Sequence, residues 1–153
     1  MRFLLAAVSF AGVAACGPPP PTTGTAAFRF SISSQARSSP NLRDPLVGAV
    51  YGNIFLSEDV SLSGPRSGAP EFGGVDVAEV DLRTEDPSTA AFTTPALEPG
   101  QYTFLGFWDL DGNGATTKDP DAGDLATLPT TNKFDIEKGV ETKRVILFDV
   151  VIN

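Results

Sequence analysis

Short stretches of alternating apolar and polar residues, separated by glycine and proline, constrain the fold of this chain more than any other feature. In residues 27–33 the apolar side chains Phe28, Phe30 and Ile32 share one face, and residues 132–137 alternate in the same way. A period of two residues is the signature of a β-strand with one buried face. No segment of a dozen residues repeats apolar positions at helical spacing, so we expect strands rather than helices.

Further segments complete the set of predicted strands. Residues 46–56 and 145–152 are apolar on both faces, which is typical of central strands. The alternation changes phase within residues 75–82, and a β-bulge near Val77 and Ala78 would reconcile the two halves. The last candidates are residues 101–108 and 90–94. Six or seven strands joined by polar loops predict a single all-β sandwich.

A run of apolar and small residues opens the chain. After Met1 and Arg2, residues 3–15 contain one polar residue, Ser9. A helix of this length would span roughly 20 Å, which is too short for a bilayer core of about 30 Å. The run therefore favours a secretion signal over residues 1–15, ending at small residues suited to cleavage.

The residues Val13-Ala14-Ala15-Cys16 resemble the lipobox of bacterial lipoproteins. The resemblance implies that Cys16, the single cysteine, is lipidated and becomes the first residue of the mature protein. Glycine rather than aspartate follows it, which favours the outer membrane. We therefore expect a protein of the cell envelope that meets the membrane through its lipid anchor, at the periplasmic face or the surface.

A proline-rich segment follows the cysteine. Four consecutive prolines favour polyproline II, which rises about 3.1 Å per residue. Residues 16–26 are thus expected to form the lipidated cysteine and its tether, and residues 27–153 the β-sandwich domain.

Charge and composition exclude several functions. The formal net charge is −8, and such an acidic surface repels nucleic acid, so we expect no nucleic-acid partner. The chain has no histidine, which excludes a Ser-His-Asp triad, a Cys-His dyad and a zinc site with imidazole ligands. No pair of acids stands out as a glycosidase dyad. We expect no enzymatic activity.

A Pro-Gly turn followed by a tyrosine marks residues 97–114. The tyrosine, Tyr102, is placed to bond back to the turn, as in the tyrosine corner of sandwich domains. This segment, LEPGQYTFLGFWDLDGNG, and residues 46–57 resemble transthyretin-like and carboxypeptidase-regulatory-like domains. The resemblance implies a Greek-key β-sandwich of about seven strands, with a structural or binding role.

The motif DLDGNG in residues 109–114 resembles the start of an EF-hand loop. Oxygen-bearing side chains alternate, and glycine stands sixth, so the loop could fold around Ca²⁺. The twelfth position is Pro120 and the flanks are strand-like, so an EF-hand fold is rejected; the alternative to an ion site is a bare tight turn. The predicted ligands are the side chains of Asp109, Asp111, Asn113, Asp119 and Asp121 and the carbonyl of Ala115.

Three aromatic residues, Tyr102, Phe104 and Trp108, share one face of a predicted strand, opposite Leu105 and Phe107. One set must face the core, and the other could stack on a sugar, unless both faces are covered. We expect a lipid-anchored, non-catalytic binding or structural module with an envelope protein or glycan as partner. The alternatives are a carbohydrate- or peptide-binding accessory module and a small carboxylate-dependent hydrolase.

Overall fold

The computed structural model describes residues 19–153. The predicted signal peptide, Cys16 and the first residues of the tether lie outside the described residues. Two short helices, α1 (Ser34–Arg37) and α2 (Gly114–Thr117), and one 3₁₀ turn, η1 (Ser57–Asp59), interrupt a fold made of strands. No helix within residues 19–153 combines the length and apolar character that crossing a membrane requires.

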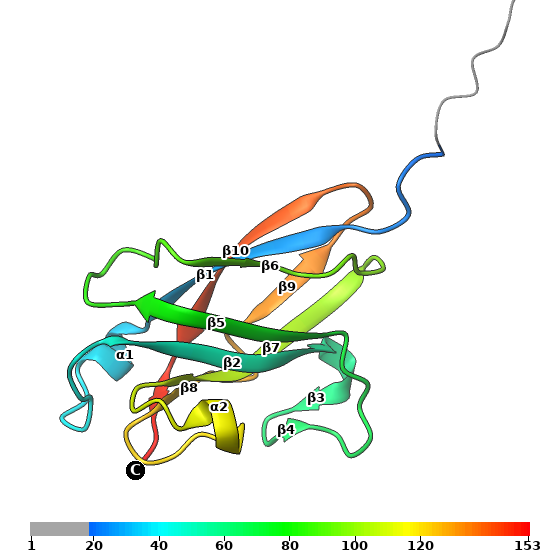
Figure 1. Ribbon diagram of the computed structural model, residues 1–153. Coiled ribbons are helices and arrows are strands. Elements are labelled where there is room, and N and C mark those ends of the chain that lie inside the picture. The colour runs from blue at the N-terminus through cyan, green and yellow to red at the C-terminus, as the bar shows by residue number, and fades with distance from the viewer. Residues whose placement is uncertain (1–18) are drawn as a thin grey trace, which may run out of the picture.

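Two packed sheets form the all-β sandwich that the sequence predicts (Figure 1). The small sheet has the order β10 (Glu141–Phe148), β1 (Thr25–Ile32), β6 (Ala91–Thr93). The large sheet has the order β11 (Val150–Val151), β8 (Leu125–Ala126), β7 (Gly100–Asp109), β2 (Val47–Leu56), β5 (Gly73–Asp81), and β9 (Lys133–Ile136) also pairs with β7. A separate hairpin joins β3 (Val60–Ser61) to β4 (Gly64–Pro65). Seven strands of the described part have three residues or more, which agrees with the predicted number.

The two ends of the domain meet in the small sheet. Strands β1 and β10 run parallel, from the pair Thr25 and Glu141 to the pair Ile32 and Phe148. The backbone is held even before β1 begins, because the Gly24 N–H donates to Leu97 O over 2.9 Å. Thr25 and Ala26, which we had expected in the tether, therefore belong to the sheet.

The core lies between the sheets and follows the predicted alternation. In β1, Phe28 and Phe30 are fully buried, whereas Arg29 between them is exposed. Phe28 packs edge-on against Phe134 of β9, with ring centroids 5.0 Å apart. The two layers are thus joined by aromatic contacts.

Strand β5 contains the predicted bulge. Gly48 of β2 pairs with Val80, but Val50 pairs with Val77, so β5 has one extra residue between these pairs. Glu79 lies within the bulge in the left-handed region, with φ of +55°. The extra residue lets both Val75 and Val80 face the core, although they stand at opposite parities.

The tyrosine corner is also confirmed. The Tyr102 hydroxyl donates a hydrogen bond to the carbonyl oxygen of Glu98 over 3.0 Å, which fixes the turn before β7. Burial, and then the charge of Glu98, raise the pKa of Tyr102. The phenol therefore stays neutral and remains a donor.

Candidate functional site

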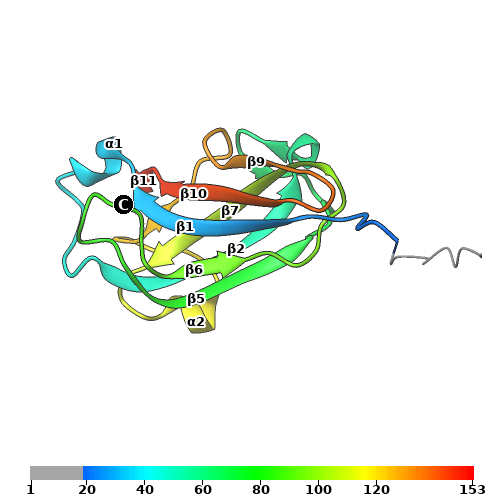
Figure 2. The same cartoon turned by 90° about the horizontal axis from the view of Figure 1, so that it is seen from above.

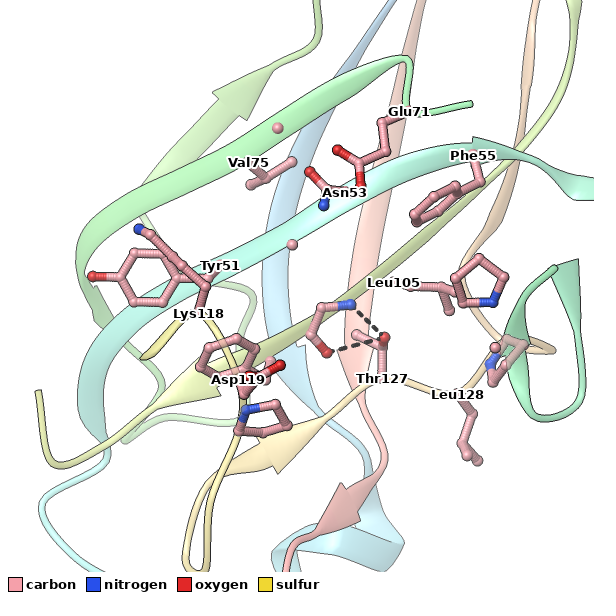
Figure 3. Close-up of a pocket in the computed structure, with 18 of the residues that line it drawn as sticks. Tyr51, Asn53, Phe55, Glu71, Val75, Leu105, Lys118, Asp119, Thr127 and Leu128 are labelled. Atoms are coloured by element: carbon pink, nitrogen blue, oxygen red, sulfur yellow. Dashed lines mark hydrogen bonds between the residues drawn. The ribbon is translucent and has the colours of Figure 1, made fainter. Parts of the chain in front are cut away.

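A groove of about 930 Å³ crosses the outer face of the large sheet (Figure 3). Its floor consists of Tyr51, Asn53 and Phe55 from β2 and Leu105 and Phe107 from β7. These side chains point outward because the alternate residues of both strands fill the core. The ring centroids of Tyr51 and Phe107 are 5.6 Å apart, so part of the floor is aromatic.

Three segments that are distant in sequence form the walls. The β3–β4 hairpin contributes Leu62 and Pro65, the turn after α2 contributes residues 118–120, and the loop after β8 contributes residues 127–129. Thr127 fixes the last of these, because its hydroxyl accepts a hydrogen bond from the Gly106 N–H over 3.0 Å (Figure 3). This wall is thus attached to the same sheet that supplies the floor.

The rim of the groove carries exposed apolar side chains. Leu62 is 83% exposed and Leu128 is 39% exposed, and both line the groove. Large apolar side chains that gather at a concave surface are typical of ligand sites.

The charged side chains of the lining are mostly acidic. Glu71, Asp76 and Asp119 stand against one cation, Lys118. The Lys118 Nζ lies 3.9 Å from Asp76 Oδ2 and 4.4 Å from the centroid of the Tyr51 ring. Burial, and then the negative charges of Asp76 and Asp109, raise the pKa of Tyr51, so its hydroxyl stays protonated.

Known proteins give no guide to this groove. No family model, curated protein or solved structure matches the chain. The resemblance to transthyretin-like domains therefore remains a prediction.

The aromatic face predicted for sugar stacking is in the core. Tyr102, Phe104 and Trp108 are each 1% exposed or less, so the idea of an open platform made of these three residues is corrected. They face the small sheet, where Phe104 packs against Phe28 of β1 and Trp108 stacks on Phe148 of β10. Leu105 and Phe107, which lie on the other face of the same strand, line the groove instead.

The loop after β7 is organised by two buried carboxylates. One oxygen of Asp109 accepts from the Gly112 N–H and the other from the Gly114 N–H, each over 2.9 Å. Asp124 accepts from the Leu110 N–H over 3.0 Å and from the Asp121 N–H over 3.1 Å. Burial raises the pKa of Asp124, although these two hydrogen bonds oppose the rise. These two side chains hold the loop together through backbone N–H groups.

The other predicted calcium ligands are more exposed. The Asn113 side-chain amide donates to Asp111 over 3.0 Å and also to Asp121, whereas Ala115 and Asp119 are exposed. Asp119 lines the groove. Within residues 19–153, no three acidic side chains are arranged so that they could hold a metal ion. The structure thus supplies a turn, and calcium binding at this loop remains a prediction.

Thermal melting in excess calcium and in excess chelator checks that prediction. If the loop binds calcium, a free calcium concentration one hundred times the dissociation constant would add about 2.7 kcal/mol to the free energy of unfolding. The melting temperature would then be higher in calcium than in chelator. Asp111→Asn would weaken the effect, whereas Asp86→Asn, in a distant exposed loop, would leave it unchanged. Equal melting temperatures in calcium and in chelator would remove the calcium prediction.

Proposed function

We propose that this chain is a non-catalytic binding module of the cell envelope, held by a lipid on Cys16, which binds its ligand in the groove over β2 and β7. The groove is the observation that carries the proposal. Its volume of about 930 Å³ lies within the range of ligand pockets, roughly 300–1,000 Å³. A lining of apolar and aromatic side chains with a few polar groups among them is the usual composition of such sites.

The position of the groove suits an anchored protein. The tether leads into β1 of the small sheet, whereas the groove opens on the outer face of the large sheet. Figure 1 shows the tether leaving at the top and α2 with the β3–β4 hairpin at the bottom. Figure 2, seen from above, has the small sheet nearer the viewer. The chain thus enters the sandwich through the sheet that does not carry the groove.

The side chains around the groove favour binding over catalysis. The chain has no histidine, so the common nucleophile and base pairs cannot form. Burial raises the pKa of Asp124, but Asp124 is not part of the groove lining. Both of its carboxylate oxygens also accept hydrogen bonds from backbone N–H groups. A carboxylate-dependent hydrolase is the less favoured alternative for this reason.

An amide-resolved NMR titration with two probes tests the proposed function. The probes are cellohexaose and a capped hexapeptide of alternating leucine and arginine. We expect at least one probe to shift the amide signals of β2 and β7 around Tyr51 and Leu105. Leu128→Asp should weaken that binding about fivefold or more, since a leucine half-buried against a ligand contributes about 1 kcal/mol.

Val140→Asp is the matched control, because Val140 is 44% exposed, close to the 39% of Leu128, but does not line the groove. It should bind like the unmodified chain. Signals that stay fixed in the groove with both probes, or that shift only elsewhere, would refute the proposed function.

A further inference from the structure

Lys118 occupies a backbone position that favours glycine. It caps the C-terminus of α2 in the left-handed region, with φ of +58°. Glycine adopts this region without steric cost and is the usual residue there. Residues held in such conformations cluster at binding and catalytic sites, and Lys118 lines the groove.

The Lys118 side chain extends across the groove to two partners of different kinds. Its ammonium lies 4.4 Å from the centroid of the Tyr51 ring and 3.9 Å from Asp76 Oδ2. An aromatic face beside a carboxylate is the arrangement that proteins use to bind organic cations. The cation in this structure is the chain's own.

We infer that Tyr51 and Asp76 form a subsite for an ammonium or guanidinium group of a ligand, and that Lys118 fills it until the ligand displaces it. The inference rests on the proposed function and deepens it. The ligand it names is an extended polypeptide segment that carries basic and apolar side chains.

Displacement of Lys118 requires little, because its contacts are open to water. The side chains of Lys118 and Asp76 are 59% and 69% exposed, and solvent screens an ion pair of this kind. Once the ammonium moves away, Tyr51 and Asp76 are both free to receive another cation.

Charge and shape favour a basic, apolar polypeptide. Once Lys118 has moved away, the groove lining presents the carboxylates of Glu71, Asp76 and Asp119. The whole chain has a formal net charge of −8. Leu62 and Leu128 at the rim offer apolar surface for alternate side chains of an extended segment. Opposite charge around an apolar groove selects partners and speeds their association. A neutral glycan carries no positive charge to balance the three carboxylates.

Isothermal titration calorimetry with the capped leucine–arginine hexapeptide tests the inference on the full chain. We expect Lys118→Gly and Lys118→Gln to bind the peptide about two- to fivefold more tightly than the unmodified chain, since an exposed cation–π contact contributes about that factor. Lys138→Gln, which removes an equal charge from the exposed turn after β9, should leave the affinity unchanged.

A second pair of variants tests the role of the Asp76 carboxylate. Asp76→Asn should weaken binding of the peptide by at least the same factor, and Asp86→Asn, also exposed but outside the groove, should not. Lys118→Gly should melt no lower than the unmodified chain, because glycine fits the left-handed backbone. That readout separates an opened subsite from a damaged fold.

Two results would overturn the inference and leave the proposed function standing. In the first, both Lys118 variants bind the peptide no more tightly than Lys138→Gln does. This would show that Lys118 does not compete with the peptide for the subsite. The other is groove binding of cellohexaose, or of a leucine–glutamate hexapeptide, without binding of the leucine–arginine peptide. If none of these probes binds in the groove, both the proposed function and the inference about Tyr51 and Asp76 are refuted.

Discussion

Replacing Asn132 with alanine is expected to lower the free energy of unfolding by about 3 kcal/mol. Asn132 is fully buried immediately before β9, where the large sheet meets β10 of the small sheet. Its Nδ2 donates to Leu147 O over 2.9 Å, and its Oδ1 accepts from the Leu147 N–H over 2.8 Å. The side-chain amide thus pairs with β10 as a neighbouring strand would.

The large effect has a specific physical cause. Alanine would remove both hydrogen bonds to β10 and leave the N–H and C=O of Leu147 without these partners. Each buried group left in this way costs roughly 1–3 kcal/mol. Asn132→Leu, which restores most of the volume, should be nearly as destabilised if the hydrogen bonds rather than packing are responsible.

Chemical denaturation of the variants measures this effect. The matched control is Asn41→Ala, since Asn41 is exposed and its side chain pairs only with the exposed Asn153 within the described chain. That control should change the free energy of unfolding by less than about 0.5 kcal/mol. Recovery of stability in Asn132→Leu would show that volume, not pairing with β10, is what Asn132 supplies.

Replacing Cys16 with alanine is expected to abolish membrane association. Each buried methylene of a lipid chain adds about 0.8 kcal/mol of membrane affinity, and a single chain anchors only weakly, so two or more chains on one residue make a durable anchor. The full chain carries a formal net charge of −8, which repels anionic lipid surfaces.

Fractionation of cells that produce the full chain checks this expectation. Cys16→Ala should yield either a soluble product or an unprocessed one without the lipid, so its recovery in the membrane fraction should fall. Val13→Leu, which moves the motif closer to the common lipobox, should stay in the membrane fraction. Membrane recovery of Cys16→Ala equal to that of the unmodified chain would contradict the anchor.

Local alternation predicted the main strands well. The expected segments 46–56 and 101–108 correspond to Val47–Leu56 and Gly100–Asp109, and the phase change in β5 is a bulge. These features follow from neighbouring residues, which the sequence displays directly. The tyrosine corner followed from four adjacent residues in the same way.

Features that depend on distant pairings could not be predicted in this way. The parallel pairing of β1 with β10 joins residues from opposite ends of the domain, and nothing in either strand specifies it. The short β3–β4 hairpin lies between the predicted strands 46–56 and 75–82, where no strand was predicted, because strands of two residues show no period.

The candidate site was predicted on the wrong face for a physical reason. Strand β7 is apolar on both sides, so its sequence alone does not say whether Trp108 or Phe107 faces the core. The answer comes from β1 and β10, which cover the Trp108 side; Trp108 stacks with Phe148 of β10 at 6.1 Å between ring centroids. The walls of the groove come from three separate loops, and only the fold brings them together.

The envelope location in the proposed function depends on export and lipid attachment at Cys16. Intact-mass spectrometry of the protein purified from its native membrane measures this directly. We expect a mature chain that starts at Cys16, with a mass increased by the acyl groups on its thiol and amine. A chain that still begins at Met1 and carries a free thiol would contradict the proposal that this domain serves at the cell envelope.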